Sequence, residues 1–239
     1  MKINIADTPA DCAREAADWI TDYAELVLQT RDRFTIALSG GSTPVALHKL
    51  LAQPPYLDRI DWKRVHVFWG DERYVPFGDE KNNAGMGFET LLNHVDVPAE
   101  QIFVMNTDLP PETSMTEYSE VLHRYFDGHE HTFDLVILGM GDDGHTLSLF
   151  PGTEVVHEER DWTKAFFLPQ QAMFRLTITA PVVNRAAAVV FQVEGENKAD
   201  SLREVLQGDY QPGKYPSQRI KPNTENFIWF LDKAAASKL

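Results

Sequence analysis

The sequence predicts an α/β fold, a doubly wound and mostly parallel sheet with flanking helices and a small antiparallel insertion. Three observations carry this prediction: short apolar runs, amphipathic stretches between the runs, and glycine-rich or charged segments directly after them. The runs are apolar on both faces, which is typical of central strands in a parallel sheet. Strands that alternate with helices along a chain favour the doubly wound arrangement.

The predicted strands are rich in β-branched and aromatic residues. The first is 2–5, and the others are 34–38 (FTIAL), 65–69 (VHVFW), 134–138 (DLVIL), 187–193 (AAVVFQV) and 227–231 (FIWFL). Apolar residues at three- and four-residue spacing predict helices over 9–29, 44–52, 83–95, 112–126 and 197–207. The pair 164–168 and 173–179 is the expected antiparallel insertion. Because no repeat or linker interrupts this pattern, one domain over 1–239 is expected.

Composition excludes several classes of protein. The chain has 239 residues, a formal net charge of −14 and one cysteine, Cys12, so it has no internal disulfide and no zinc site built on several thiolates. That cysteine usage suits a reducing cytoplasm, and no segment approaches the length of a membrane helix. The acidic balance disfavours nucleic-acid binding. An anionic substrate would therefore require the few cations and some backbone N–H groups to gather at one place.

A glycine loop follows the strand 34–38. Gly40 and Gly41 permit a sharp turn and a close approach to a ligand, while Ser42 or Thr43 can cap the helix that Pro44 begins. Uncommitted N–H groups at such a helix start bind phosphate. The Walker lysine is missing, so a nucleotide loop is excluded. An ordinary capped turn remains the alternative.

Charged residues follow two other strands. Asp71 and Arg73, two residues apart after 65–69, offer an acid or base beside a cation, or else a surface ion pair. Lys198 lies in the first helical turn after 187–193, where a cation opposes the helix dipole. That placement is tolerable if an anion shares the site; the alternative is a solvated lysine.

The segment after 134–138 matches a dinucleotide fingerprint, with glycines at 139, 141 and 144. Asp142 and Asp143 would face the pyrophosphate, and the sequence at 150–152 leaves room for at most a short helix. The required acidic residue at the end of a second strand is also missing. We therefore expect no nicotinamide or flavin cofactor. Asp143 and His145 remain, and histidine is well suited to accept a proton near neutral pH.

These four segments all follow strands of one sheet, where doubly wound folds bind ligands. Together they predict a site for a small phosphorylated substrate, with acid–base chemistry and no metal.

The same segments resemble those of the compact bacterial 6-phosphogluconolactonases, in family order over most of the chain. The resembling blocks are LSGGSTP (38–44), DWKRVHVFWGDERYVP (61–76), NNAGMGFETLL (82–92), FDLVILGMGDDGHTLSLFPG (133–152), FRLTIT (174–179), GENKAD (195–200) and FIWFLDKAA (227–235). GDDGHTLSLFPG is the most specific. The chain departs from the family at Asp142, where proline is usual, at Asn82, where serine is usual, and at LPQQAMF before Arg175.

The resemblance implies a ribose-5-phosphate isomerase-like fold and hydrolysis of 6-phospho-D-glucono-1,5-lactone to 6-phospho-D-gluconate, the second step of the oxidative pentose phosphate pathway. It implies no cofactor and no metal, since a lactone carbonyl is already electrophilic. His145 would be the general base, with Asp143 or Asp71 orienting it. Arg73 would offset the oxyanion or hold the phosphate. The remaining phosphate ligands would be Gly40, Gly41, Ser42, Thr43, Arg175 and Lys198.

Two alternatives have the same architecture. Glucosamine-6-phosphate deaminases carry Asp-Glu-Tyr where this chain has Asp71-Glu72-Arg73, and they supply a glutamate after the histidine, whereas 146–150 contains no carboxylate. Non-catalytic sugar-phosphate-binding domains of bacterial regulators need a helix-turn-helix, which the chain lacks. The lactonase is therefore the preferred hypothesis, as a cytoplasmic monomer or small homo-oligomer whose partner is a phosphorylated sugar lactone, without nucleic acid or membrane.

Overall fold

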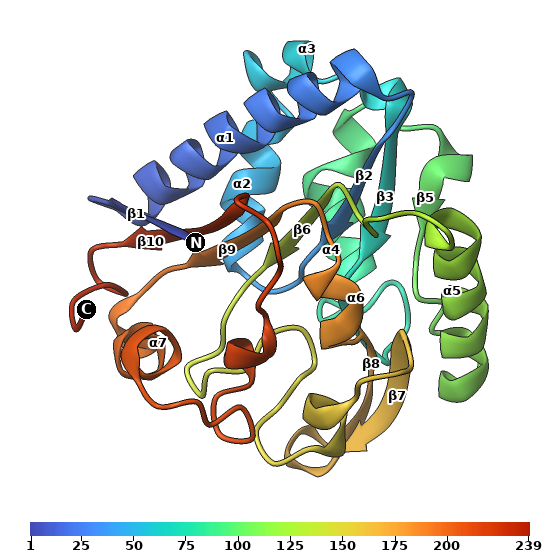
Figure 1. The fold of residues 1–239 in the computed structure, drawn as a ribbon. Coiled ribbons are helices and arrows are strands. Elements are labelled where there is room, and N and C mark those ends of the chain that lie inside the picture. Colours follow the sequence, from blue (N-terminus) through green and yellow to red (C-terminus); the bar gives the residue numbers. More distant parts are fainter.

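The chain forms two sheets of different size (Figure 1). This computed structural model describes residues 1–239. The larger sheet has the strand order β1-β10-β9-β6-β2-β3-β5, and all of its pairs are parallel. Its strands are β1 (Lys2–Ala6), β2 (Phe34–Leu38), β3 (Val65–Trp69), β5 (Ile102–Phe103), β6 (Leu135–Leu138), β9 (Val189–Val193) and β10 (Phe227–Asp232). The predicted parallel sheet is confirmed; β5, with two residues, is too short for a sequence pattern to show.

The smaller sheet contains the predicted insertion and one strand that the sequence did not predict. The insertion is β7 (Thr163–Leu168) paired antiparallel with β8 (Met173–Ile178). The third strand is β4 (Asp71–Arg73), which pairs antiparallel with β8. The prediction that Asp71 and Arg73 lie in a loop is wrong, because β8 offers β4 a backbone partner that a run of three charged residues does not reveal.

Seven helices connect the strands, and none is both long and apolar enough to cross a bilayer. They are α1 (Pro9–Thr30), α2 (Thr43–Leu51), α3 (Tyr56–Arg59), α4 (Asn83–Thr90), α5 (Pro111–Phe126), α6 (Ala180–Asn184) and α7 (Ala199–Gln207). Two predicted helices are shorter than expected. α4 stops because Leu91 leaves the helical conformation and a 3₁₀ turn follows, and α7 begins only after a 3₁₀ turn over Glu196–Lys198.

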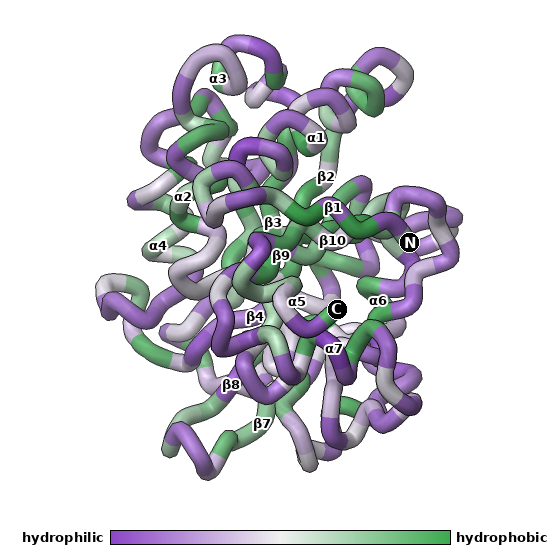
Figure 2. Tube along the Cα trace, turned by 90° about the vertical axis from the view of Figure 1, so that its left-hand side faces the viewer, coloured by the Kyte–Doolittle hydropathy of each residue, from purple (hydrophilic) through white to green (hydrophobic).

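Each face of the large sheet has its own hydrophobic cluster. Along β6 and over residues 36–38 of β2, successive residues belong alternately to the two clusters, as the period of a strand requires. Helices α1 to α4 cover one face, and α5, α6, α7 and the small sheet cover the other (Figure 1). In Figure 2 the hydrophobic segments concentrate along the central strands, and hydrophilic ones surround them. This double coverage explains why the central strands are apolar on both sides.

A buried carboxylate fixes the amino ends of β2 and β6. Asp134, which is 4% exposed, accepts hydrogen bonds at 2.8 Å from both the backbone N and the hydroxyl of Thr35. Its other oxygen pairs with Nη1 of Arg31 at 2.6 Å. The Thr35 hydroxyl in turn accepts from the Asp134 backbone N. These bonds set the register of the two strands whose opposite ends carry the glycine loop and His145.

A second buried carboxylate joins β4 to α4. Glu72, 1% exposed, accepts hydrogen bonds from the backbone N–H groups of Arg73, Asn83 and Ala84. Burial raises the pKa of Glu72 to about 7, although those three bonds act in the opposite direction. The side chain therefore gains a proton on folding over a range of pH in which an exposed glutamate is ionised.

Replacing Asp134 by alanine should lower the free energy of unfolding by about 2 kcal/mol, because the buried Thr35 donors lose a charged acceptor. Denaturant unfolding measures this loss. Asp32→Ala is the matched control: Asp32 is an exposed neighbour whose side chain has no partner, and its effect should stay within about 0.5 kcal/mol. Equal losses in the two variants would contradict a structural role for Asp134.

Glu72 should make stability depend on pH. Its pKa of about 7 in the folded chain lies above the ordinary 4.5, so the folded protein binds the proton more tightly. The stability contributed by this group is therefore complete below about pH 4.5 and is lost as the pH rises through 7. Urea unfolding of Glu72→Gln between pH 5 and 8 should show a smaller decline than wild type, whereas the exposed Glu130→Gln should follow wild type. An unchanged slope in Glu72→Gln would refute this assignment.

Candidate active site

The four segments singled out in the sequence lie at one edge of the large sheet. The strands that precede them, β3, β2, β6 and β9, are neighbours in this order. All four are parallel, so their carboxyl ends meet at the same edge. The segments after them are 39–42, 70–73, 139–146 and 194–198. The topology therefore agrees with the prediction that the four segments follow neighbouring strands of one sheet.

His145 and Asp143 form a tight pair. Nδ1 of His145 lies 2.6 Å from Oδ1 of Asp143, and the same oxygen accepts from the His145 backbone N at 3.0 Å. The opposite ring nitrogen, Nε2, has no protein partner. The positive φ of Gly144, 79°, allows the turn that folds the two side chains together. A dinucleotide-binding fingerprint requires a helix directly after the glycine-rich turn, and no helix follows this turn.

The surroundings of the pair favour an ionised aspartate beside an oriented ring. Burial alone would raise the pKa of Asp143, but its hydrogen bonds with His145 outweigh burial and lower the pKa overall. Phe150 stacks on the imidazole, with ring centroids 4.2 Å apart. With Nδ1 held by the carboxylate and one face covered, the ring can accept a proton only at Nε2.

Asp71 contacts a different partner. Its Oδ2 pairs with Nη2 of Arg175 at 2.7 Å and accepts from the Ser148 hydroxyl at 2.7 Å. Arg175 also donates from Nε to Ser148 and from Nη1 to Gln171, and only 3% of the residue is exposed. Of the two candidates for orienting His145, Asp143 thus contacts the ring, whereas Asp71 neutralises a buried arginine.

Arg73 lies directly opposite Arg175 in the antiparallel pair β4–β8. Residues opposite each other in a ladder point to the same face, so two guanidinium groups share this face with one carboxylate, that of Asp71. The Arg73 side chain donates from Nη1 to the Lys81 carbonyl and has no ion pair. The local excess of positive charge suits an anion.

The glycine loop leaves the start of α2 without a side-chain cap. Ser42 occupies the N-cap position, but its hydroxyl makes no capping hydrogen bond, so the expected cap by Ser42 or Thr43 is wrong. Gly41 has a φ of 91°, a conformation that favours glycine. At Gly40 a Cβ atom would lie 1.7 Å from Oδ1 of Asn83, so the amide of Asn83 packs flat on the loop. The unused N–H groups at the helix start are available to an anion.

Lys198 ends the 3₁₀ turn that precedes α7. Its side chain is half-buried, and its ammonium has no ion pair or hydrogen bond within the protein. A cation at the start of a helix opposes the dipole. In a chain with an excess of carboxylates, this unpaired ammonium is an obvious ligand for an anion.

Sequence reasoning missed the residues that connect these groups. Ser148 joins Asp71 to Arg175, and Asn83 donates from Nδ2 to the Asp71 carbonyl at 2.8 Å while covering Gly40. Both lie within blocks that carry the family resemblance, and that was the only signal available. Their roles depend on contacts between segments far apart in the chain.

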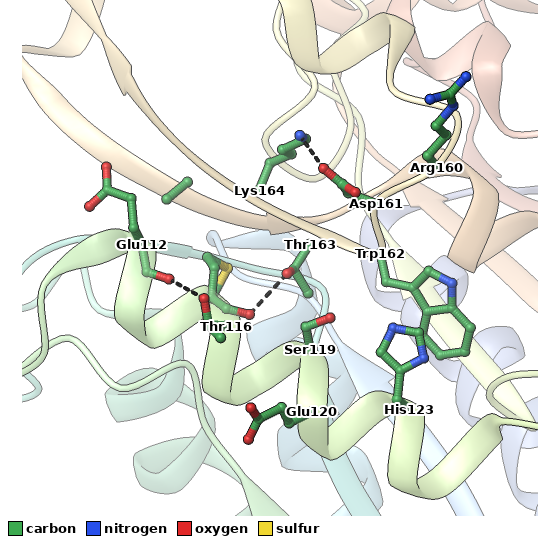
Figure 3. A pocket seen from close by; sticks show the side chains of 12 residues that line it. Glu112, Thr116, Ser119, Glu120, His123, Arg160, Asp161, Trp162, Thr163 and Lys164 are labelled. Carbon is green, nitrogen blue, oxygen red and sulfur yellow. Dashed lines mark hydrogen bonds and ion pairs between the residues drawn. The ribbon is translucent and has the colours of Figure 1, made fainter.

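A separate hollow of 510 Å³ lies between α5 and β7 (Figure 3). His123 stacks on Trp162 there, with ring centroids 4.1 Å apart, and Lys164 pairs with Asp161 and Glu158. None of the residues assigned to the site lines this hollow. Lys164 is neutralised by its own neighbours, whereas Arg160, which also lines the hollow, has no ion pair.

Known proteins resemble the chain over nearly its full length. The family model described as glucosamine-6-phosphate isomerases/6-phosphogluconolactonase matches residues 7–229. A 6-phosphogluconolactonase of Nostoc sp. is 38% identical, covering 98% of this chain and 96% of the relative. One from Synechocystis sp. is 39% identical, covering 92% and 90%.

A solved structure agrees with these relatives. The crystal structure of 6-phosphogluconolactonase from Thermotoga maritima superposes with a TM-score of 0.84 at 26% identity, covering 97% of this chain and 99% of that one. Fold, sequence and the arrangement of the sheet edge therefore agree. The chain belongs to the family of glucosamine-6-phosphate isomerases and 6-phosphogluconolactonases.

Proposed function

We propose that the chain hydrolyses 6-phospho-D-glucono-1,5-lactone to 6-phospho-D-gluconate, the second step of the oxidative pentose phosphate pathway. The observation that carries this proposal is the Asp143–His145 pair, whose Nε2 has no protein partner, at a sheet edge that also gathers unpaired cations. The names of the relatives supply the substrate. The remaining steps follow from the chemistry of the side chains.

His145 acts as general base. Its Nε2 takes a proton from water as the water oxygen attacks the lactone carbonyl, and the carbonyl oxygen becomes an oxyanion. Asp143, kept ionised by its bonds to His145, stabilises the imidazolium that forms. When the tetrahedral intermediate collapses, the bond to the ring oxygen breaks and the imidazolium returns the proton to that oxygen. A positioned base of this kind contributes about 10²- to 10⁴-fold.

The phosphate binds to hydrogen-bond donors and to one cation that have no protein partner. This subsite consists of the backbone at Gly40 and Gly41, the hydroxyls of Ser42 and Thr43, and the ammonium of Lys198. Arg73 completes it or offsets the oxyanion. Binding the remote phosphate orients the carbonyl toward His145.

Arg175 and Asp71 take a supporting part in this proposal. The three nitrogens of Arg175 already bond protein atoms, so it supports the structure around the phosphate while Asp71 and Ser148 hold it. Direct contact of Arg175 with phosphate stays a prediction from the resemblance.

The deaminase alternative lacks support from the residues around the base. Arg73 stands where that enzyme carries tyrosine. After His145 the chain has no carboxylate up to Phe150, the residue that stacks on the imidazole.

The proposal also covers the domain organisation, location and assembly of the protein. We propose a single catalytic domain over 1–239, active in the cytoplasm as a monomer or small homo-oligomer, without nucleic acid or membrane.

His145→Ala should reduce kcat by about 10²- to 10⁴-fold with little change in KM, because it removes the base and leaves the phosphate site intact. The measurement is a pH-stat assay with freshly generated 6-phosphogluconolactone, corrected for spontaneous hydrolysis. His129→Ala changes an exposed histidine that precedes β6, whereas His145 follows it, and this control should match wild type. Wild-type turnover no faster than background would overturn the proposal, and ammonia release from glucosamine 6-phosphate would then support the deaminase.

Lys198→Ala should mainly raise KM, by about tenfold, since it removes a charged partner of the phosphate worth roughly 1.4 kcal/mol or more. The same assay with varied substrate and ionic strength measures it. Lys49→Ala removes an exposed, unpaired lysine of α2 and should leave KM near the wild-type value. If Lys198→Ala lowered kcat as severely as His145→Ala, the division between binding and catalysis would be wrong.

A further inference from the structure

The turn that carries Asp143 and His145, residues 139–146, forms hydrogen bonds with a distant segment at Ser217. Within residues 139–146 the hydrogen bonds are mostly internal: Gly144 N donates to the Gly141 carbonyl, Gly141 N to the His145 carbonyl, and the Thr146 hydroxyl to the Gly139 carbonyl. The Thr146 carbonyl accepts from the nearby Leu149 N, and the carbonyl of Gly144 is bonded by a distant segment. It accepts from both the backbone N of Ser217, at 2.9 Å, and the Ser217 hydroxyl, at 2.8 Å.

This double contact lies at the peptide group between the two members of the catalytic pair. The Gly144 carbonyl belongs to the peptide unit that leads into His145, so fixing the oxygen fixes the plane from which the imidazole projects. Ser217 is 1% exposed, which shields both hydrogen bonds from water. Tyr215 packs against the same glycine, where a Cβ would lie 3.0 Å from its ring.

The segment that carries Ser217 is itself anchored to α7. Gln218 donates from Nε2 to the carbonyls of Glu204 and Asp209, each at 2.9 Å, and its Oε1 accepts from Gln211 N at 2.6 Å. Helix α7 begins directly after Lys198. A continuous chain of contacts therefore runs from the proposed phosphate ligand, along α7 and through 209–218, to the turn that holds His145.

We infer that Ser217 is a positioning residue for the general base: its two hydrogen bonds to the Gly144 carbonyl hold the Asp143–His145 turn in the geometry that hydrolysis requires. The kinetic consequence of this inference rests on the proposed lactone hydrolysis. Its structural consequence, the ordering of residues 139–146, is independent of the proposed function. A small displacement of a reacting group is enough to cost a large factor in rate, which makes the turn sensitive to this support.

The test compares Ser217→Ala with wild type. Alanine keeps the backbone bond to Gly144 and removes the hydroxyl bond. We expect kcat to fall about tenfold with KM changed less than twofold, because the phosphate ligands are untouched. Native-state hydrogen exchange should become faster at the amides of Gly141, Gly144 and His145, while peptides from β2 exchange as in wild type.

Two further variants separate positioning from general destabilisation. Thr132→Val removes a buried hydroxyl that donates to the Val182 carbonyl at 2.8 Å, at the opposite edge of the sheet. It should lower Tm by a similar amount without changing kcat or exchange in the turn. Tyr215→Ala should lower kcat, and Tyr215→Phe should retain it, since the ring and not the hydroxyl covers Gly144.

The outcomes are distinguishable. Wild-type kcat and wild-type exchange in Ser217→Ala would overturn the inference and leave the proposed function intact. A rise in KM at constant kcat would overturn it as well. If the wild type itself shows no lactone turnover, the proposed function fails. Hydrogen exchange in the turn then still tests the positioning role: if the amides of Ser217→Ala are as protected as those of Thr132→Val, Ser217 does not position the turn.

Discussion

Asp71 and Arg175 form a buried ion pair at the junction of the two sheets, and several parts of the site are attached to it. Removing two charges from water is costly and is offset only when their remaining hydrogen-bonding positions are filled. Here Ser148 bonds both partners, Gln171 takes another guanidinium nitrogen, and Asn83 holds the Asp71 backbone. Because Ser148 lies shortly after His145 and Asn83 packs on Gly40, the pair links the catalytic turn to the glycine loop.

Charge distribution explains how an acidic protein can present a site for an anion. The net charge of −14 repels phosphate at most of the surface. At the sheet edge, however, Arg73 faces Arg175 across β4 and β8, and Lys198 has no partner. Asp71 is the one carboxylate that forms an ion pair with either arginine. The fold thus places two cations without an ion pair, Arg73 and Lys198, shortly after the ends of β3 and β9.

The base and the anion subsite are built on different kinds of support. Asp143 and His145 lie two residues apart, and the turn between them is closed by its own backbone bonds. The anion subsite is assembled from the loop after β2, from β4 and from the 3₁₀ turn before α7, which are far apart in the chain. The external bond from Ser217 joins the two, so the orientation of the imidazole depends on α7, the helix that begins directly after Lys198.

Every strand of the parallel sheet except β5, most of the helices, and the four segments at the carboxyl edge could be predicted from the sequence alone. This was possible because apolar periodicity and glycine-rich turns are local properties of the chain. The Asp143–His145 pair was also accessible, since its two members are close in sequence. The pairing of Asp71 with Arg175 and not with His145, the strand at 71–73 and the bond from Ser217 to Gly144 emerged only from the folded structure. The missing cap at Ser42 and the contacts of Ser148 and Asn83 were likewise seen only there. The pairings of Asp71, β4 and Ser217 join segments that are tens of residues apart, and no local pattern of residues records which distant segment will fill a hydrogen bond.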